Sequence, residues 1–267
     1  MDITLTQGII LAIVAIIAGF DFWLEGLYIF RPIIVCTLTG VVVGDTTLGI
    51  VAGGLTELAF AGLTPAGGTQ PPNPILAGVM TVVIAHTTGH NPATSIGLAL
   101  PFSFLMQYII LFFYSIFSVF MVKSDQYAAE ANTKAFARIT IIPMIIVALT
   151  YGVVVFLCGY IAQEPMKALV HAMPDWLSHG FEIAGGILPA VGFGLLLKVM
   201  LKAKFVPYLL IGFLAASFIK FSNLLPVAVI GAAAALYQFY NDKEKEKLAQ
   251  QIAESSAYMG GGFDDGI

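Results

Sequence analysis

The chain has 267 residues, of which 58% are hydrophobic and 10% are charged, and its net charge is −4 at pH 7. Because a soluble chain carries roughly 45–50% apolar and about 25% charged residues, this composition excludes a soluble enzyme and a secreted module. The acidic balance and the lack of a basic block exclude a nucleic-acid partner. Apolar runs recur along nearly the whole chain, which predicts an all-α polytopic membrane protein.

The first apolar run, residues 1–19, has no basic leading region and no small-residue cleavage site. We therefore expect a retained first segment and not a removed signal peptide. Asp21, Glu25 and Arg31 follow it and stand before Pro32. This cluster is interpreted mainly as an interfacial loop with local ion pairing.

The N-terminal third contains short, interrupted apolar segments at 33–43, 48–63 and 75–85. A spanning helix needs about 20 apolar residues, so none of the three is long enough for a full span. The Gly- and Pro-rich stretch 64–74 cannot form a regular helix. Such segments in a transporter indicate broken and re-entrant helices around a binding site. Asp45, at one of the breaks, is expected to cap the helix that follows it.

Longer apolar runs in the rest of the chain are candidate membrane helices, at residues 98–122, 139–161, 185–199, 205–218 and 224–240. Three groups of basic residues, in 123–138, 198–204 and 243–247, contain nine of the 12 Lys and Arg residues. The positive-inside rule places all three groups in the cytoplasm.

Two further segments follow from this orientation. Residues 164–182 then lie outside, and their mixed apolar and polar pattern predicts an interfacial amphipathic helix. Residues 241–267 form a polar cytoplasmic tail, which we expect to begin as a helix extension and to continue into disorder.

Glu57 is an acid within an apolar run, where a charge costs roughly 2.5–3.5 kcal/mol at a helix centre. It should therefore face protein or a water-filled cavity. Its carboxylate could accept two hydroxyl hydrogen bonds from a polyol ligand. The alternative is an acid paired with backbone or a helix terminus for structural reasons.

The segment from Gln70 to Pro74 contains Pro71, Pro72 and Pro74, which lack N–H donors and bias their predecessors to extended backbone. It offers free carbonyls and the side-chain amides of Gln70 and Asn73 in a stiff frame. Amides both donate and accept, which suits neutral, hydroxyl-rich ligands. The alternative is a structural loop at the membrane surface.

The sequence indicates no catalytic residue, metal or cofactor. His86 and His90 are four residues apart, but Gly and Pro nearby favour a loop, and no third ligand is close. Cys36 and Cys158 have no metal-binding spacing and are expected to be buried thiols. There is no phosphate-binding motif, so this chain alone should not phosphorylate a substrate.

Residues 30–45, 53–68 and 180–186 resemble the IIC subunit of the mannose–fructose–sorbose class of the bacterial phosphotransferase system. The resemblance covers nearly the whole chain up to the tail. It implies one transmembrane domain over residues 1–240, with a sugar-site region at about 33–92. The variant over residues 63–75 most resembles the N-acetylgalactosamine/galactosamine branch.

The resemblance implies a multi-pass permease of the bacterial cytoplasmic (inner) membrane, in contact with membrane lipid. Such a subunit pairs with a second membrane subunit, IID, in trimers of IIC–IID heterodimers, and moves sugar by an elevator-like shift. Cytoplasmic IIA and IIB proteins relay phosphate from phosphoenolpyruvate, and IIB phosphorylates the sugar as it emerges. The IIC subunit is then the permease and carries no phosphorylation site.

The sugar contacts of the family, carried over to this sequence, fall on Glu57, Gln70 and Asn73, with Thr56, Gly68 and Thr69 as neighbours. Mannose-type members lack the Gln-Pro-Pro-Asn run, so the assignment of individual hydroxyl groups stays open. Two other functions also stay open. One is an ion-coupled secondary sugar transporter with Glu57 as proton carrier, and the other is a membrane scaffold without transport of its own.

Overall fold

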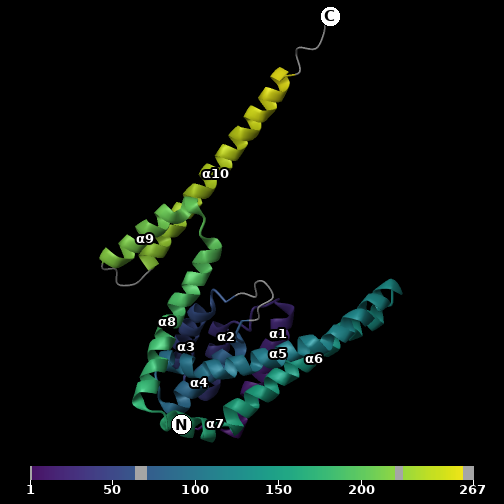
Figure 1. The fold of residues 1–267 in the computed structure, drawn as a ribbon, viewed down its shortest axis with the longest axis vertical. Helices are drawn as coiled ribbons and strands as arrows, with labels where there is room; N and C mark the ends of the chain where they lie inside the picture. The colour runs from purple at the N-terminus through teal and green to yellow at the C-terminus, as the bar shows by residue number, and fades with distance from the viewer. Residues whose placement is uncertain (1, 64–70, 220–224, 261–267) are drawn as a thin grey trace, which may run out of the picture. The chain divides into compact units, whose positions relative to one another are not determined.

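The computed structural model describes residues 2–63, 71–219 and 225–260 (Figure 1), and every regular element in these ranges is a helix. The chain divides into two compact units, Met1–Val199 and Met200–Ile267. The first unit contains helices α1 to α8 and a π-helical turn, η1. Their bounds are α1 Leu5–Leu24, α2 Pro32–Val43, α3 Thr46–Phe60, α4 Pro74–Thr88, α5 Pro92–Ala129, α6 Thr133–Phe156, η1 Leu157–Ile161, α7 Gln163–His171 and α8 Asp175–Met200.

Four helical segments in the described residues are long and apolar enough to cross a membrane: Leu5–Leu24, Pro92–Ala129, Thr133–Ile161 and His179–Met200. The predicted all-helical membrane fold is confirmed. The run expected at 98–122 is part of the longer helix α5, because Asn91 caps it and Pro92 occupies its first position. A prediction from apolar residues alone does not include a polar first turn of this kind.

The breaks predicted in the N-terminal third are present as helix ends. The Asp45 side chain accepts a hydrogen bond from the Leu48 backbone N–H at 2.9 Å, so the predicted cap is confirmed. Gly44 and Gly89 follow α2 and α4 with φ of 85° and 73°, a conformation that favours glycine. His86 lies within the last turn of α4, so the loop predicted for it was wrong, whereas His90 lies in the loop between α4 and α5, as predicted.

Helix α4, which contains the short apolar run 75–85, forms the centre of the first unit. All residues from Ile75 to Ala85 are buried, and α4 packs against α2, α3 and α5. A helix that is apolar on every side is a core helix. Its short length is therefore consistent with a helix surrounded by protein.

Small residues allow the neighbouring helices to approach closely. A Cβ atom on Gly40 of α2 would lie 2.6 Å from the Cα of Gly49 in α3. A Cβ atom on Gly19 of α1 would lie 2.4 Å from the Tyr151 ring of α6. Small residues at such contacts are the usual means of packing membrane helices, since lipid provides no hydrophobic drive for association.

The N-terminus is bound to the start of α7. The Gln163 side chain accepts a hydrogen bond from Ile3 N at 2.8 Å and donates one to Ile3 O at 3.0 Å. Lys167 forms ion pairs with Asp2 and Glu164. The helix predicted over 164–182 is in fact two elements, because α7 ends at His171 and α8 begins after Pro174.

The second unit contains a 3-10 turn, η2 (Ala203–Phe205), followed by α9 (Val206–Phe218) and α10 (Leu225–Gly260). Helices α9 and α10 pack against each other. Helix α10 continues through the polar tail, so the predicted helix extension is present and reaches Gly260. Residues 261–267 lie outside the described residues.

Candidate functional site

A cavity of about 220 Å³ lies where the first four helices begin or end. The α1–α2 loop forms one wall, the end of α3 a second, and the proline segment before α4 a third. The first residues of α2 and α4 also face it, which brings two positive helix N-termini to the same space. Its lining residues are Phe22, Glu25, Tyr28, Phe30, Arg31, Pro32, Phe60, Leu63, Pro71, Pro72 and Pro74.

A buried carboxylate holds the α1–α2 loop in shape. Asp21 is 5% exposed and accepts hydrogen bonds from the backbone N–H groups of Leu27 at 2.8 Å and Ile29 at 2.6 Å. Glu25 and Tyr28 adopt positive φ values of 47° and 59°. Each such conformation costs about 1–3 kcal/mol and persists only where the surroundings impose it. Asp21 therefore stabilises a strained loop and does not form the ion pair predicted for this cluster.

Arg31 pairs with Glu57, which lies 26 residues away on α3. The Arg31 Nε atom donates to Glu57 Oε1 at 2.7 Å, and Nη2 donates to the same oxygen. Glu57 Oε2 accepts a hydrogen bond from the Ile33 backbone N–H at 3.2 Å, at the start of α2. The carboxylate thus has the structural pairing with a helix terminus that was the alternative interpretation of this residue.

The ion pair is partly exposed, with 36% of the Arg31 side chain and 21% of the Glu57 side chain accessible. Arg31 lines the cavity, whereas Glu57 lies behind it and is not a lining residue. In the sequence Arg31 stands with Asp21 and Glu25 before Pro32, and this pattern does not indicate Glu57 as its partner. A lone arginine directly before a proline at the start of an apolar run was the available signal.

Asn73 is 2% exposed, and both its side-chain oxygen and its side-chain nitrogen have partners within the protein. Its Oδ1 atom caps α4 by accepting the Leu76 backbone N–H at 3.1 Å, and its Nδ2 atom donates to the hydroxyl group of Tyr151. Its backbone carbonyl accepts a hydrogen bond from Ser103 Oγ at 2.8 Å. In this arrangement Asn73 fixes the proline segment to α5 and α6.

None of the predicted site residues in the described ranges lines the cavity itself. Pro71, Pro72 and Pro74 share the cavity wall with Arg31, and Glu57 reaches the same wall through that arginine. Thr56 is buried and donates to the Ala52 carbonyl at 2.7 Å, so its hydroxyl serves its own helix. The predicted residues Gly68, Thr69 and Gln70 lie outside the described residues.

Aromatic side chains form the part of the wall that sequence reasoning missed. Phe22, Tyr28, Phe30 and Phe60 line the cavity, and the Phe22 and Phe30 rings meet edge to face with centroids 5.2 Å apart. A pocket with apolar walls and a few oriented polar groups is typical of a small-molecule site. No periodic pattern marks these aromatic residues among the 20 phenylalanines and 10 tyrosines of the chain.

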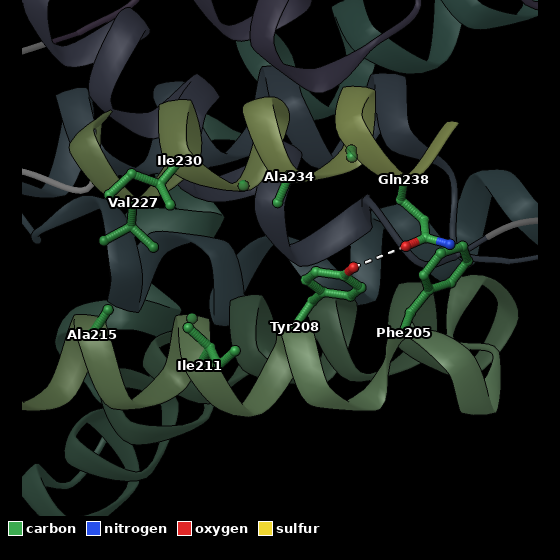
Figure 2. Close-up of a pocket in the computed structure, with 11 residues that line it drawn as sticks. Phe205, Tyr208, Ile211, Ala215, Val227, Ile230, Ala234 and Gln238 are labelled. Atoms are coloured by element: carbon green, nitrogen blue, oxygen red, sulfur yellow. Dashed lines mark hydrogen bonds between the residues drawn. The ribbon is translucent and has the colours of Figure 1, made fainter. Parts of the chain in front are cut away.

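A larger cavity of about 350 Å³ lies in the second unit, between α9 and α10 (Figure 2). Its walls are apolar or small side chains, and its main polar feature is the hydrogen bond of 2.9 Å from Tyr208 to Gln238. Such a groove suits a hydrocarbon chain or an apolar side chain better than a ligand rich in hydroxyl groups. Of these two cavities, the smaller is better suited to a polar substrate.

Cys36 and Cys158 are free and buried, as the sequence predicted. Within the described ranges, no three His, Cys, Asp or Glu side chains group as a metal site would require.

Comparison with known proteins decides the family. Residues 5–237 match the family model described as the PTS (phosphotransferase system) sorbose-specific IIC component. The chain is 62% identical, over 95% of both chains, to N-acetylgalactosamine permease IIC component 1 of Escherichia coli (strain K12). The chain belongs to the mannose/sorbose IIC family of the phosphotransferase system. It is thus a sugar-transporting permease component of the bacterial inner membrane, and not a phosphoryl-carrying domain.

Two solved structures support the fold of this IIC component. One, described only as a membrane protein, matches with a TM-score of 0.80 and 27% identity over 90% of this chain and 97% of the other. The second is the mannose transporter ManYZ in complex with microcin E492, with a TM-score of 0.56 and 28% identity over the same shares.

Proposed function

We propose that this IIC component imports N-acetylgalactosamine or galactosamine and binds the sugar in the cavity between α1, α2, α3 and α4. The observation that carries the substrate is the 62% identity to the N-acetylgalactosamine permease IIC component over 95% of both chains. Of the residues that the family resemblance suggests, Glu57 belongs to the proposed site through Arg31, and Gly68, Thr69 and Gln70 precede the proline segment of its wall in the sequence. Asn73 and Thr56 support the surrounding helices.

The chemistry of the cavity suits a monosaccharide. A pyranose ring has apolar C–H faces, which match the aromatic side chains, and hydroxyl edges, which need hydrogen-bonding partners. Arg31 and Glu25 provide charged groups, and they lie beside Pro71 and Pro72, which carry no N–H donors. These groups replace the water that the sugar loses when it enters the membrane.

Phosphorylation makes import effectively one-way. A phosphate group adds about −1.5 to −2 charges at neutral pH. Because Arg31 compensates Glu57, repulsion by that carboxylate is a minor contribution. The apolar passage through the bilayer disfavours the charged product, so the sugar phosphate does not return.

The proposed assembly contains a IID subunit, with IIA and IIB in the cytoplasm, and IIB phosphorylates the sugar as it leaves the cavity. The match to a structure of ManYZ, a mannose transporter, supports a membrane complex of this type. We also propose the trimer of IIC–IID heterodimers and the elevator-like movement that the family resemblance implies.

Uptake of labelled N-acetylgalactosamine tests this proposal. The chain and its IID partner are expressed in cells that lack other carriers for this sugar but retain IIA, IIB and the general phosphotransferase proteins. We expect uptake that depends on phosphoenolpyruvate and survives collapse of the proton gradient. Uptake that an uncoupler abolishes and that needs no phosphoenolpyruvate would instead establish an ion-coupled transporter.

A further inference from the structure

Arg31 is a charged residue that lines the cavity, and its ion-pair partner, Glu57, does not line it. Its guanidinium directs Nε and Nη2 to a single oxygen of Glu57. Arginine has five N–H donors in a planar fork, and no hydrogen bond between described residues uses the Nη1 atom. The side chain is 36% exposed at the cavity, so donors remain available on that side.

Glu57 is held on two sides and is therefore suited to fix the guanidinium. One of its oxygens accepts both donors of Arg31, and the other accepts the Ile33 backbone N–H at 3.2 Å. The partial positive charge at the start of α2 also favours a carboxylate there. Glu57 is not a lining residue of the cavity, so it reaches a ligand through Arg31.

We propose that Arg31 contacts the substrate directly, and that Glu57 is the positioning residue that aims the guanidinium into the cavity. This inference rests on the proposed function, and it assigns the direct sugar contact to Arg31, whereas the sequence suggests Glu57. The free N–H donors of Arg31 match acceptor oxygens on the sugar. The best neutral acceptor of an N-acetylated sugar is the carbonyl oxygen of its acetamido group.

The same geometry has a consequence for specificity. A guanidinium has N–H donors and no acceptor, so it can donate to the acetamido carbonyl of N-acetylgalactosamine but cannot bind the protonated amine of galactosamine. Glu25 lines the same cavity and acts in the opposite sense, since its carboxylate attracts an amine. The balance of Arg31 and Glu25 therefore selects between the free and the acetylated amino sugar.

Binding measurements on the purified IIC–IID complex test the proposal through Arg31→Lys and Arg31→Gln. Lysine keeps the charge but loses the planar fork. The matched control is Arg138→Gln, which changes the only other arginine of the chain, exposed on α6. We expect Arg31→Lys to lower affinity for N-acetylgalactosamine at least roughly tenfold, the loss of about one charge-assisted hydrogen bond.

Comparing the affinities for the two sugars shows whether Arg31 contacts the sugar or only forms a structural ion pair. We expect Arg31→Gln to weaken N-acetylgalactosamine binding more than galactosamine binding, and Glu25→Gln to do the reverse. Unchanged affinity in both Arg31 variants would reject the inference alone. Absence of sugar binding in the unmodified complex would reject the proposed function, and the inference with it.

A second measurement uses the unmodified complex and does not depend on a variant folding. An arginine-selective dicarbonyl reagent modifies exposed guanidinium groups, and mass spectrometry follows Arg31 and Arg138 separately. We expect saturating N-acetylgalactosamine to slow modification of Arg31 several-fold and to leave Arg138 unchanged. Equal modification of Arg31 with and without bound sugar would overturn the proposed contact.

Discussion

Replacing Asn73 shows whether its side-chain amide stabilises the fold or binds the sugar. The Asn73 side chain caps α4 and donates to the Tyr151 hydroxyl, and both groups are buried. In Asn73→Ala, loss of the cap costs about 1 kcal/mol. The orphaned Tyr151 hydroxyl costs about 1–3 kcal/mol more. We therefore expect a loss of about 2–4 kcal/mol of stability.

A double-mutant cycle tests this sum, with thermal unfolding of the purified IIC–IID complex as the assay. Tyr151→Phe removes the hydroxyl, so Asn73→Ala in that background should cost only the cap, about 1 kcal/mol. Asn73→Ser is the matched control, because serine keeps a cap but is too short to reach Tyr151. Wild-type stability of Asn73→Ala, together with weakened sugar binding, would refute this reasoning and make the amide a ligand.

Three further predictions concern other contacts. Glu57→Gln should reduce sugar uptake roughly tenfold at unchanged membrane abundance, because a charge-assisted bond to Arg31 is lost; wild-type uptake would remove Glu57 from the site. In α3, Gly49→Ala should lower the unfolding temperature through overpacking, since its Cβ would lie 2.7 Å from a backbone oxygen. Gly54→Ala is the control and should leave the unfolding temperature unchanged, because its Cβ would have no neighbour within 4 Å. Equal effects of the two substitutions would contradict the close packing. Lys167 donates to Asp2 and attracts its charge, which lowers the pKa of that carboxyl from 3.8. This stabilisation is present above the ordinary pKa and is lost as pH falls through the lowered pKa. Hydrogen exchange at the Ile3 amide, corrected for its intrinsic pH dependence, should therefore show an acid transition that Asp2→Asn lacks.

Local signals in the sequence predict local structure well. The Asp45 cap follows from Gly-Asp before a helical run, and the short apolar runs correctly indicate helices that do not span a bilayer alone. The break between α7 and α8 has an equally local cause in Pro174, which the pattern of apolar residues over 164–182 concealed. Helices can extend beyond the apolar runs that predict them when their ends consist of polar residues, as in the first turn of α5 after Asn91.

The site depends on contacts between distant residues, which composition and spacing do not contain. Glu57 was identified as an exceptional acid, yet its partner is 26 residues away, and an ion pair there was not predicted. Asn73 has the chemistry of a sugar ligand and of a helix cap alike. Its partner Tyr151, 78 residues away, is what makes it a structural residue in this fold.

Phosphorylation in membrane vesicles tests the central claim most directly. Vesicles that carry this chain with its IID subunit receive phosphoenolpyruvate, the general phosphotransferase proteins, IIA and IIB, together with labelled N-acetylgalactosamine. We expect phosphorylated sugar with both membrane subunits present and none when either is left out. Equal phosphorylation without this chain, or none with the complete set for either amino sugar, would contradict it.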